Sequence, residues 1–127
     1  MSLADTARSR AAARTTHSPS RGGLAGWQVK RLGELAGGDL RGLTIVGLAG
    51  AVRLSPFHFT RAFAASMGTT PGQWLIALRH ERAKTLLDGT ELSVAEVARH
   101  VGYSGAPQLT RAFRALTGQT PTGYRRR

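Results

Sequence analysis

The chain has 127 residues, which is the size of one domain or of two very small ones. Eighteen Lys and Arg residues against seven Asp and Glu give a formal net charge of +11, and sixteen of the eighteen are Arg. The absence of cysteine excludes a disulfide framework, a thiolate nucleophile and a zinc site with Cys ligands. This basic excess favours a polyanionic partner, because the planar donor fork of Arg suits phosphates and guanine edges.

Histidine spacing and hydropathy argue against a metal site, a membrane-spanning segment and a secretory signal. No two of the four histidines lie three or four residues apart, the usual spacing of metal ligands on a helix, so we expect no metal and no cofactor. The longest apolar run, from Leu43 to Val52, is about half the length that spans a bilayer. The basic N-terminus lacks the apolar core of a secretory signal, so we expect a cytoplasmic protein with no membrane contact.

The spacing of apolar residues along the chain predicts its secondary structure. Residues 1–22 are rich in Ala, Arg, Ser and Thr without apolar periodicity, which predicts a disordered basic N-terminal tail. From Leu24 onward, helical patterns alternate with Gly, Ser and Thr-Pro, and no stretch alternates like a strand. The prediction is an all-α fold with about seven helices, at 25–36, 43–52, 56–67, 71–88, 93–101, 106–117 and a short turn from Pro121.

An internal repeat organises these helices. FTRAFAASMGTTPGQW, from Phe59, aligns with LTRAFRALTGQTPTGY, from Leu109, at an offset of fifty residues. Upstream, LTIVGLAGAVRLS aligns with LSVAEVARHVGYS at an offset of forty-nine, so the second copy has one extra residue in the turn between its helices. Each copy predicts a helix-turn-helix lobe. The expected domains are a first lobe over 23–70, a linker helix over 71–88 and a second lobe over 89–127.

The second helix of each copy has one apolar and one polar stripe. The stripes expected to be buried are Phe59, Ala62, Phe63 and Met67 in the first copy and Leu109, Ala112, Phe113 and Leu116 in the second. The opposite stripes are Phe57, Thr60, Arg61 and Ala64, and Pro107, Thr110, Arg111 and Arg114. A recognition helix needs this arrangement, because the buried stripe fixes its rotation and an outward Arg can reach guanine in the major groove. A solvated or ion-paired Arg is the alternative, which the repetition of the Thr-Arg pair disfavours.

The helix between the copies carries a third pattern. WLIALRHERAKTLL resembles the aromatic-Leu-x-x-x-Arg-x-x-x-Ala-x-x-Leu-Leu linker of the AraC/XylS family of bacterial regulators. LSVAEVARHVGYS resembles the entry to that family's second helix-turn-helix, and LTRAFRALTGQTPTGYR resembles its signature end. The resemblance runs from about Leu24 to Arg125, roughly four-fifths of the chain. It implies two helix-turn-helix lobes of homeodomain-like type, joined by a linker helix, whose second helices enter successive segments of the major groove.

The resemblance also implies residue roles. The family's base-reading positions correspond here to Phe57, Thr60 and Arg61 in the first lobe and to Ala106, Pro107, Thr110 and Arg111 in the second. Phe57 could touch a thymine methyl and Arg61 could bind guanine. Ala106 and Pro107 stand where polar side chains are common, so we expect the second lobe to read fewer bases. There Arg114 is expected to contact the DNA backbone.

Four further residues are predicted to be structural: Arg79, Glu96, Trp74 and Tyr124. Arg79 lies on a wide apolar face of the linker helix, so it needs a partner, and Glu96 is the candidate. Trp74 and Tyr124 follow the two Thr-Pro pairs at matching positions and are expected to pack in the core. His80 replaces a usual aliphatic residue, and we expect it to be partly buried.

These observations predict a sequence-specific transcription regulator that binds double-stranded DNA in the nucleoid. It is expected to bind as a monomer, since one chain already holds two recognition helices. RNA polymerase is a second candidate partner, and no small-molecule effector domain is visible. Two alternatives stay open: a truncated regulator acting as a protein-interaction module, and a weakly specific nucleic-acid binder. Some alkyl-transfer repair enzymes carry this domain, but they need an acceptor Cys, so we expect no enzyme and no catalytic residue.

Overall fold

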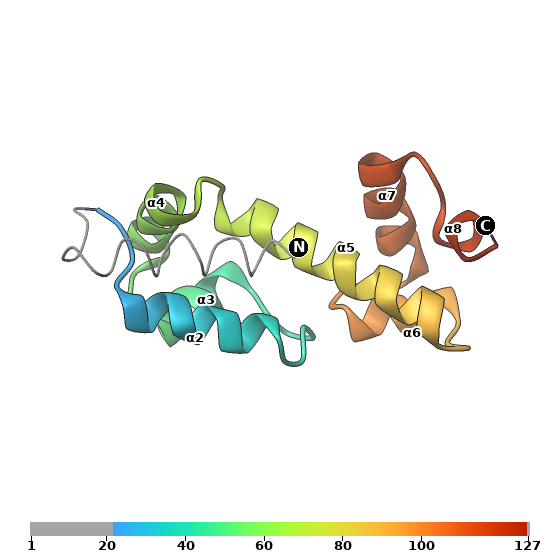
Figure 1. Ribbon diagram of the computed structural model, residues 1–127, viewed down its shortest axis with the longest axis horizontal. Coiled ribbons are helices and arrows are strands. Elements are labelled where there is room, and N and C mark those ends of the chain that lie inside the picture. Colours follow the sequence, from blue (N-terminus) through green and yellow to red (C-terminus); the bar gives the residue numbers. More distant parts are fainter. Residues whose placement is uncertain (1–21, 127) are drawn as a thin grey trace. The chain divides into compact units, whose positions relative to one another are not determined.

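The computed structural model describes residues 22–126, and the predicted N-terminal tail, apart from Gly22, lies outside them. The described residues form helices joined by short turns, with no strand among them (Figure 1). The helices are α2 (Gly26–Ala36), α3 (Ile45–Ala51), α4 (Pro56–Met67), α5 (Pro71–Gly89), α6 (Val94–His100), α7 (Ala106–Thr117) and α8 (Pro121–Arg125). The all-α prediction is confirmed, and each predicted helix is found within two residues at either end.

The described residues divide into two compact units that share α5. Unit 1 holds residues 22–38 together with Leu43–Leu75. Unit 2 holds Asp39–Gly42 and residues 76–126. The helix α5 runs without a break through the point of division after Leu75. The domain boundaries given above stay predictions, because the division describes contacts and not independent folding.

Aromatic side chains form the centre of unit 1. The ring centroids of Phe59 and Phe63 lie 5.6 Å apart, and those of Phe63 and Trp74 lie 5.3 Å apart, both edge to face. This arrangement matches the quadrupoles of the rings. Leu32 from α2 and Leu48 from α3 are fully buried in the same unit. The helices α2, α3 and α4 therefore each contribute an apolar side to the core.

Two buried polar side chains in unit 1 have hydrogen-bond partners. Gln28 donates its side-chain amide to the carbonyl of Val52 at 2.9 Å, and its oxygen accepts the Ala25 N–H at 2.7 Å. Ser66 accepts the Leu24 N–H at 2.7 Å through Oγ. A buried polar group without a partner is destabilising, so these bonds also fix how the start of α2 meets the rest of the unit.

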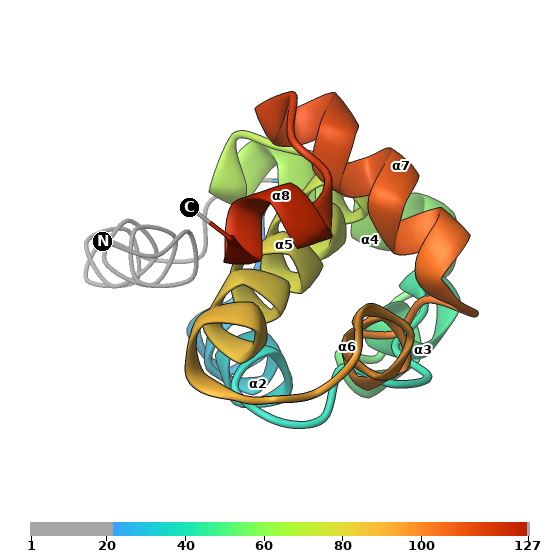
Figure 2. The ribbon, with the colours of Figure 1, turned by 90° about the vertical axis from the view of Figure 1, so that its right-hand side faces the viewer.

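Unit 2 has its own core beneath α7. Its buried members are Ala83, Leu87, Val97, Ala98, Val101, Leu109 and Phe113. Tyr124 of α8 packs edge to face on Phe113 with centroids 5.3 Å apart. Within this unit α8 binds the end of α5 through Tyr124 and Arg125, and Figure 2 draws α8 in red beside that end.

The two helix-turn-helix turns differ in length by one residue. Residues 52–55 separate α3 from α4, and residues 101–105 separate α6 from α7. The extra residue expected from the change of offset is therefore confirmed. Since Ser55 begins α4 as its cap and Gly105 begins α7, the additional residue lies directly before α7.

Candidate nucleic-acid interface

The sequence at both ends of α4 fixes its length. Ser55 accepts the His58 N–H at 3.2 Å through its side chain, and Pro56 occupies the first helical position. At the other end Gly68 adopts φ 75°, the left-handed conformation that glycine accommodates without a steric penalty. Its N–H binds the Ala64 carbonyl at 3.0 Å. The helix therefore begins and ends where the sequence predicts.

One face of α4 is buried and fixes the rotation of the helix. Its buried residues are Phe59, Ala62, Phe63, Ser66 and Met67, which include the whole predicted apolar stripe. The opposite face is exposed, and the Phe57 side chain is 73% accessible. The Arg61 guanidinium lies over the Phe57 ring at 5.7 Å from its centroid. Thr60 donates its hydroxyl to the Pro56 carbonyl at 3.0 Å, which leaves its oxygen available as an acceptor.

The helix α7 presents a different outer face. It begins after Gly105, which has no side chain to cap the helix, and Pro107 lies in its first turn. Pro107, Arg111 and Arg114 are exposed, whereas Ala106 and Thr110 are half-buried. The first turn of α7 therefore offers apolar surface without side-chain donors, and the two guanidiniums lie further along the helix.

Leu116 corrects the predicted stripe of α7. Leu109 and Phe113 are buried as predicted and Ala112 is half-buried, but Leu116 is 51% exposed. The core cluster of unit 2 includes Leu109 and Phe113 from α7 and nothing after Phe113 on that helix. The last turn of α7 thus extends beyond the core, which helical spacing alone does not reveal.

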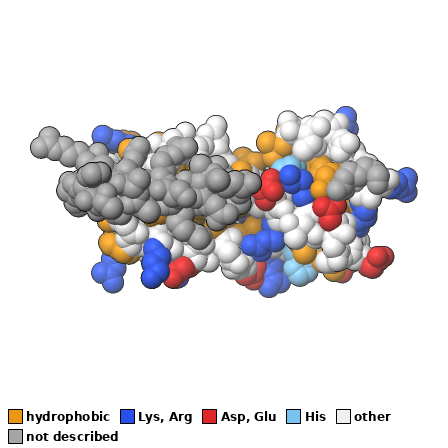
Figure 3. Space-filling view, in the orientation of Figure 1, with side chains coloured by type: hydrophobic (Ala, Val, Ile, Leu, Met, Phe, Trp, Pro, Cys, Tyr) orange, Lys and Arg blue, Asp and Glu red, His pale blue; other side chains and the backbone are white. Residues whose placement is uncertain are grey.

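The arginines of the two outer faces have no acidic partners within the described chain. Ion pairs among the described residues include those of Arg31 with Glu34, Arg41 with Asp39 and Lys84 with Glu81. Arg61, Arg111 and Arg114 form none, so the ion-paired alternative for these side chains fails among the described residues. Figure 3 shows Lys and Arg side chains in blue on one face of the protein, with acidic side chains between them.

Arg79 and Glu96 contact different groups, so the predicted ion pair between them is not found among the described residues. Glu96 accepts the Ser93 N–H at 3.0 Å, while Ser93 accepts the Glu96 N–H at 3.1 Å, which is a reciprocal cap at the start of α6. These bonds to Ser93 lower the pKa of the exposed Glu96 carboxyl, and Arg99 and His100 lower it further. Arg79 lies near the other end of α6, where its guanidinium stacks over Tyr103 at 5.2 Å. Glu96 is thus a helix cap, and a structural role for Arg79 stays a prediction.

The two aromatics after Thr-Pro differ in burial. Trp74 is only 2% exposed and contacts Phe63, whereas Tyr124 is half-buried against Phe113. The hydroxyl of Tyr124 donates to Oδ2 of Asp88 at 2.9 Å, so it links α8 to the end of α5. The second aromatic therefore keeps a polar contact that the first does not share.

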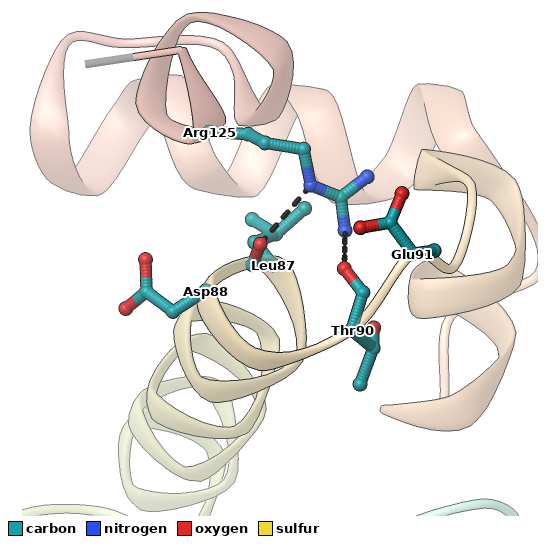
Figure 4. Close-up of a pocket in the computed structure, with 5 residues that line it drawn as sticks. All are labelled: Leu87, Asp88, Thr90, Glu91 and Arg125. Carbon is teal, nitrogen blue, oxygen red and sulfur yellow. Dashed lines mark hydrogen bonds between the residues drawn. The ribbon is translucent and has the colours of Figure 1, made fainter.

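Arg125 binds the end of α5 and the turn that follows it, a contact that the sequence did not predict. It donates to the carbonyl of Leu87 at 3.0 Å, to that of Leu92 at 2.6 Å and to that of Thr90 at 3.3 Å. Carbonyls at a helix C-terminus lack helical partners, and a guanidinium both bonds them and complements the helix dipole. Arg125 lines a pocket of about 480 Å³ together with Asp88 and Glu91. Figure 4 shows its side chain reaching from α8 toward Leu87 and Thr90. The acceptors precede Arg125 by at least 33 residues, so no local pattern signals the contact.

His80 packs beneath α7. Its ring centroid lies 4.7 Å from that of Phe113, and the residue is half-buried as expected. Burial lowers the pKa of the imidazole, and Lys84 lowers it further, while Glu81 opposes the shift. The described residues contain no group of three or more His, Asp or Glu side chains placed to hold a metal ion. None of the described helices is long and apolar enough to cross a membrane.

The sequence is similar to bacterial regulatory proteins. Residues 48–127 match the helix-turn-helix domain family. The MmsAB operon regulatory protein of Pseudomonas aeruginosa is 39% identical over 85 residues, which are 67% of this chain and 28% of that protein. The bifunctional transcriptional activator/DNA repair enzyme AdaA of Bacillus subtilis is 34% identical over 83 residues, which are 65% and 39% of the two chains. The chain thus spans well under half the length of these curated relatives.

The fold is similar to solved domains of two regulatory proteins. The DNA-binding domain of AdpA, a global transcriptional factor crystallised with a target DNA, has a TM-score of 0.73 and 29% identity, over 78% of this chain and 89% of that one. The C-terminal domain of AraT, a response regulator from Geobacillus stearothermophilus, has a TM-score of 0.73 and 28% identity, over 81% and 86% of the two chains. Both likenesses extend over nearly the whole of the solved domains.

Proposed function

Since this chain belongs to the AraC/XylS family of helix-turn-helix DNA-binding domains, we propose that it is a transcription regulator that reads double-stranded DNA sequence. Its recognition helices are α4 and α7, and they enter successive segments of the major groove. One observation carries the proposal: both helices bury one stripe and expose an Arg at the same position of the repeat, Arg61 and Arg111. The AdpA domain bound to its target DNA supports the same use of the fold.

The two helices have different roles in recognition. Phe57, Thr60 and Arg61 give α4 an apolar group, an acceptor and a donor fork, which together can distinguish base pairs. Ala106 and Pro107 give the tip of α7 no side-chain donor, so α7 reads fewer bases through Thr110 and Arg111. Arg114 of α7 contacts phosphates. Contacts to phosphate position a protein on the duplex, whereas contacts to base edges specify the sequence.

Binding is monomeric in this proposal, because one chain supplies two recognition helices. The two half-sites then lie about one helical turn, roughly 10 bp, apart in an asymmetric site. If about six phosphates are neutralised, the logarithm of the affinity falls with a slope near −5 in the logarithm of salt concentration. Sedimentation of the complex should show one protein per duplex, and an obligatory pair of proteins on a palindrome would contradict this part of the proposal.

The cellular setting follows from the same family membership. We propose the bacterial nucleoid in the cytoplasm as the place of action and RNA polymerase as a second partner. No catalytic activity is proposed: the alkyl-transfer repair reaction known for this domain class needs an acceptor Cys, and the 127-residue sequence has none. Chromatin crosslinking in the source bacterium, followed by sequencing, should recover discrete sites upstream of genes.

A selection from random duplexes tests the proposal. The protein is allowed to choose from a pool of double-stranded oligonucleotides, and its affinity for a chosen duplex is compared with that for a scrambled duplex at one salt concentration. A specific regulator should prefer the chosen duplex by about 10³-fold or more. A ratio near one would favour the second candidate, a weakly specific binder or protein-interaction module, which the donor-free tip of α7 at Ala106 and Pro107 supports.

A further inference from the structure

Phe57 and Arg61 form a stacked pair on the exposed face of α4. They lie one helical turn apart, and the guanidinium carbon is 5.7 Å from the centroid of the ring. The Phe57 side chain is 73% exposed, so its ring supports Arg61 and contributes nothing to the core. A guanidinium held over an aromatic face is attracted by the ring quadrupole, which restricts a side chain that would otherwise sample many rotamers.

The distance between the two groups limits what they can read together. Successive base pairs are about 3.4 Å apart along the duplex, so a separation of 5.7 Å covers less than two steps. A guanidinium suits O6 and N7 of guanine, and the apolar group that the major groove offers is the C5 methyl of thymine. The pair therefore presents a donor fork and an apolar ring to neighbouring base pairs.

We infer that Phe57 and Arg61 read one dinucleotide step, in which a guanine lies next to a pyrimidine that carries a C5 methyl group. Arg61 binds the guanine, and Phe57 contacts the methyl and positions Arg61. Because cytosine methylated at C5 presents the same methyl group, the step can be thymine–guanine or 5-methylcytosine–guanine. The inference rests on the proposed function, in which α4 enters the major groove.

The second recognition helix supplies an internal comparison. Arg111 occupies the position of Arg61 in the repeat, but the residue one turn before it is Pro107, which has no aromatic ring. Pro107 cannot form a cation–π stack, so nothing equivalent positions Arg111. A methyl group that affects the reading of the neighbouring guanine through a stacked Arg is therefore expected in the half-site bound by α4 and not in that bound by α7.

Single-atom changes in the DNA test the inference. With the full chain and a duplex selected from a random pool, each thymine in turn is replaced by uracil, which removes the C5 methyl and keeps the base pairing. One thymine next to a guanine should show a loss of about three- to five-fold in affinity, the effect of exposing one buried methyl group. Replacing that thymine–adenine pair by cytosine–guanine and methylating the cytosine should restore affinity by the same factor.

Variants of Phe57 separate its two roles. F57A should abolish the methyl effect at that step without lowering the melting temperature, because the side chain is exposed. F57L keeps an apolar group but removes the ring, so it should retain part of the methyl effect while weakening the preference for the neighbouring guanine. An effect of thymine-to-uracil replacement that persists unchanged in F57A would overturn the inference.

The outcomes also separate this inference from the proposed function. A selected duplex that is strongly preferred over scrambled DNA, yet has no methyl-dependent thymine beside a guanine, overturns the inference and leaves the proposed function intact. If no duplex is preferred over scrambled DNA, the proposed function fails and the inference fails with it. A methyl-dependent step lost in F57A supports both.

Discussion

Arg53 and Gly102 occupy the same place in the two copies of the repeat, and both have positive φ, 61° and 104°. Each is followed by a residue whose N–H returns to the preceding helix, Leu54 to Ala49 and Tyr103 to Ala98, both at 2.9 Å. The two turns thus share a backbone conformation and differ in the residue that adopts it. Among the described residues other than glycine, only Arg53 has a positive φ.

Replacing Arg53 by Gly should stabilise the protein. A left-handed conformation costs an L-residue about 1–2 kcal/mol, and the greater freedom of Gly in the unfolded chain offsets about half of this. The R53G variant should therefore unfold at a temperature higher by a few degrees, measured by calorimetry. An unchanged or lower melting temperature would show that the Arg53 side chain makes a stabilising contact.

Replacing Gly102, the matching residue of the second turn, by Ala should have the opposite effect on stability. A Cβ atom at Gly102 would lie 2.9 Å from the Leu40 carbonyl oxygen and 3.0 Å from Nε of Arg79, and φ 104° would be strained as well. G102A should destabilise the protein by more than 1 kcal/mol in denaturant titrations. Equal stability of G102A and the wild type would mean that Leu40 and Arg79 move away at little cost.

Gly50 is a second site for stabilisation. It lies in α3, and a Cβ atom there would meet nothing within 4 Å. G50A should raise the free energy of unfolding by about 0.5–1 kcal/mol through the lower entropy of the unfolded chain. The matched control is G47A in the same helix, whose Cβ would lie 3.1 Å from Oγ1 of the capping Thr44. G47A should gain less than G50A, and a larger gain for G47A would contradict this account.

Arg125 should be essential for the packing of α8 on α5. R125A removes the donor to the carbonyls of Leu87, Thr90 and Leu92 and should cost about 1–3 kcal/mol in the free energy of unfolding. R126A is the control, because Arg126 is an exposed neighbour and its substitution removes the same charge. The account is contradicted if thermal unfolding shows equal losses for the two variants.

His80 should make stability depend on pH in a defined direction. Its folded pKa is lowered, so between that value and the unfolded value of about 6.5 the unfolded chain binds more protons than the folded one. The contribution of His80 to the free energy of unfolding is therefore fully present above pH 6.5. It decreases as the pH falls below this value and levels off below the folded pKa. The nearby groups are Lys84 and Glu81 on α5 and the uncharged Phe113 on α7.

The H80F variant isolates this contribution, because it keeps a ring against Phe113 and cannot be protonated. The difference in melting temperature between pH 7.5 and pH 5.5 should be smaller in H80F than in the wild type. Identical differences would show that other groups cause the pH dependence. The carboxyl groups of Asp39, with a pKa of about 2, and of Glu96, also lowered, stay ionised over this range.

Local patterns were sufficient to predict the helices of this protein. Ser55-Pro56 and Gly68 mark the ends of α4, and its apolar spacing predicts its buried face. The sequence could not show where each core ends, so Leu116 was wrongly placed in the buried stripe. The partners of Arg79 and Arg125 depend on contacts distant in sequence, for which no local spacing exists. The role of Glu96 was predictable, since Ser93 three residues before it is the pattern of a capping box.

The base-reading residues are a different kind of prediction. The structure gives the exposure of Phe57, Arg61 and Arg111, which depends on the fold alone. Which base each one contacts depends on the DNA, so the assignments stay predictions. The stack of Arg61 on Phe57 could have been anticipated, because residues four apart on a helix are neighbours on its surface.

Arg114 and Arg61 should differ in what they contribute. R114A is expected to lower affinity for every duplex and to reduce the salt slope by about one, because it would remove the proposed phosphate contact. Arg111 has the same place in the repeat as Arg61, so R111A should instead relax a base preference in the other half-site. A change in base preference with R114A, at an unchanged salt slope, would show that α7 reads bases with Arg114.

The proposed reading of bases by α4 is tested most directly by the affinity of R61A for selected and for scrambled duplexes, measured at one salt concentration. A bidentate Arg–guanine contact provides about 1–3 kcal/mol of discrimination. We predict that R61A loses roughly five- to hundred-fold of its preference for the selected duplex while its affinity for scrambled DNA falls far less. An equal loss of affinity for both duplexes would contradict the account, because Arg61 would then be contacting only the DNA backbone.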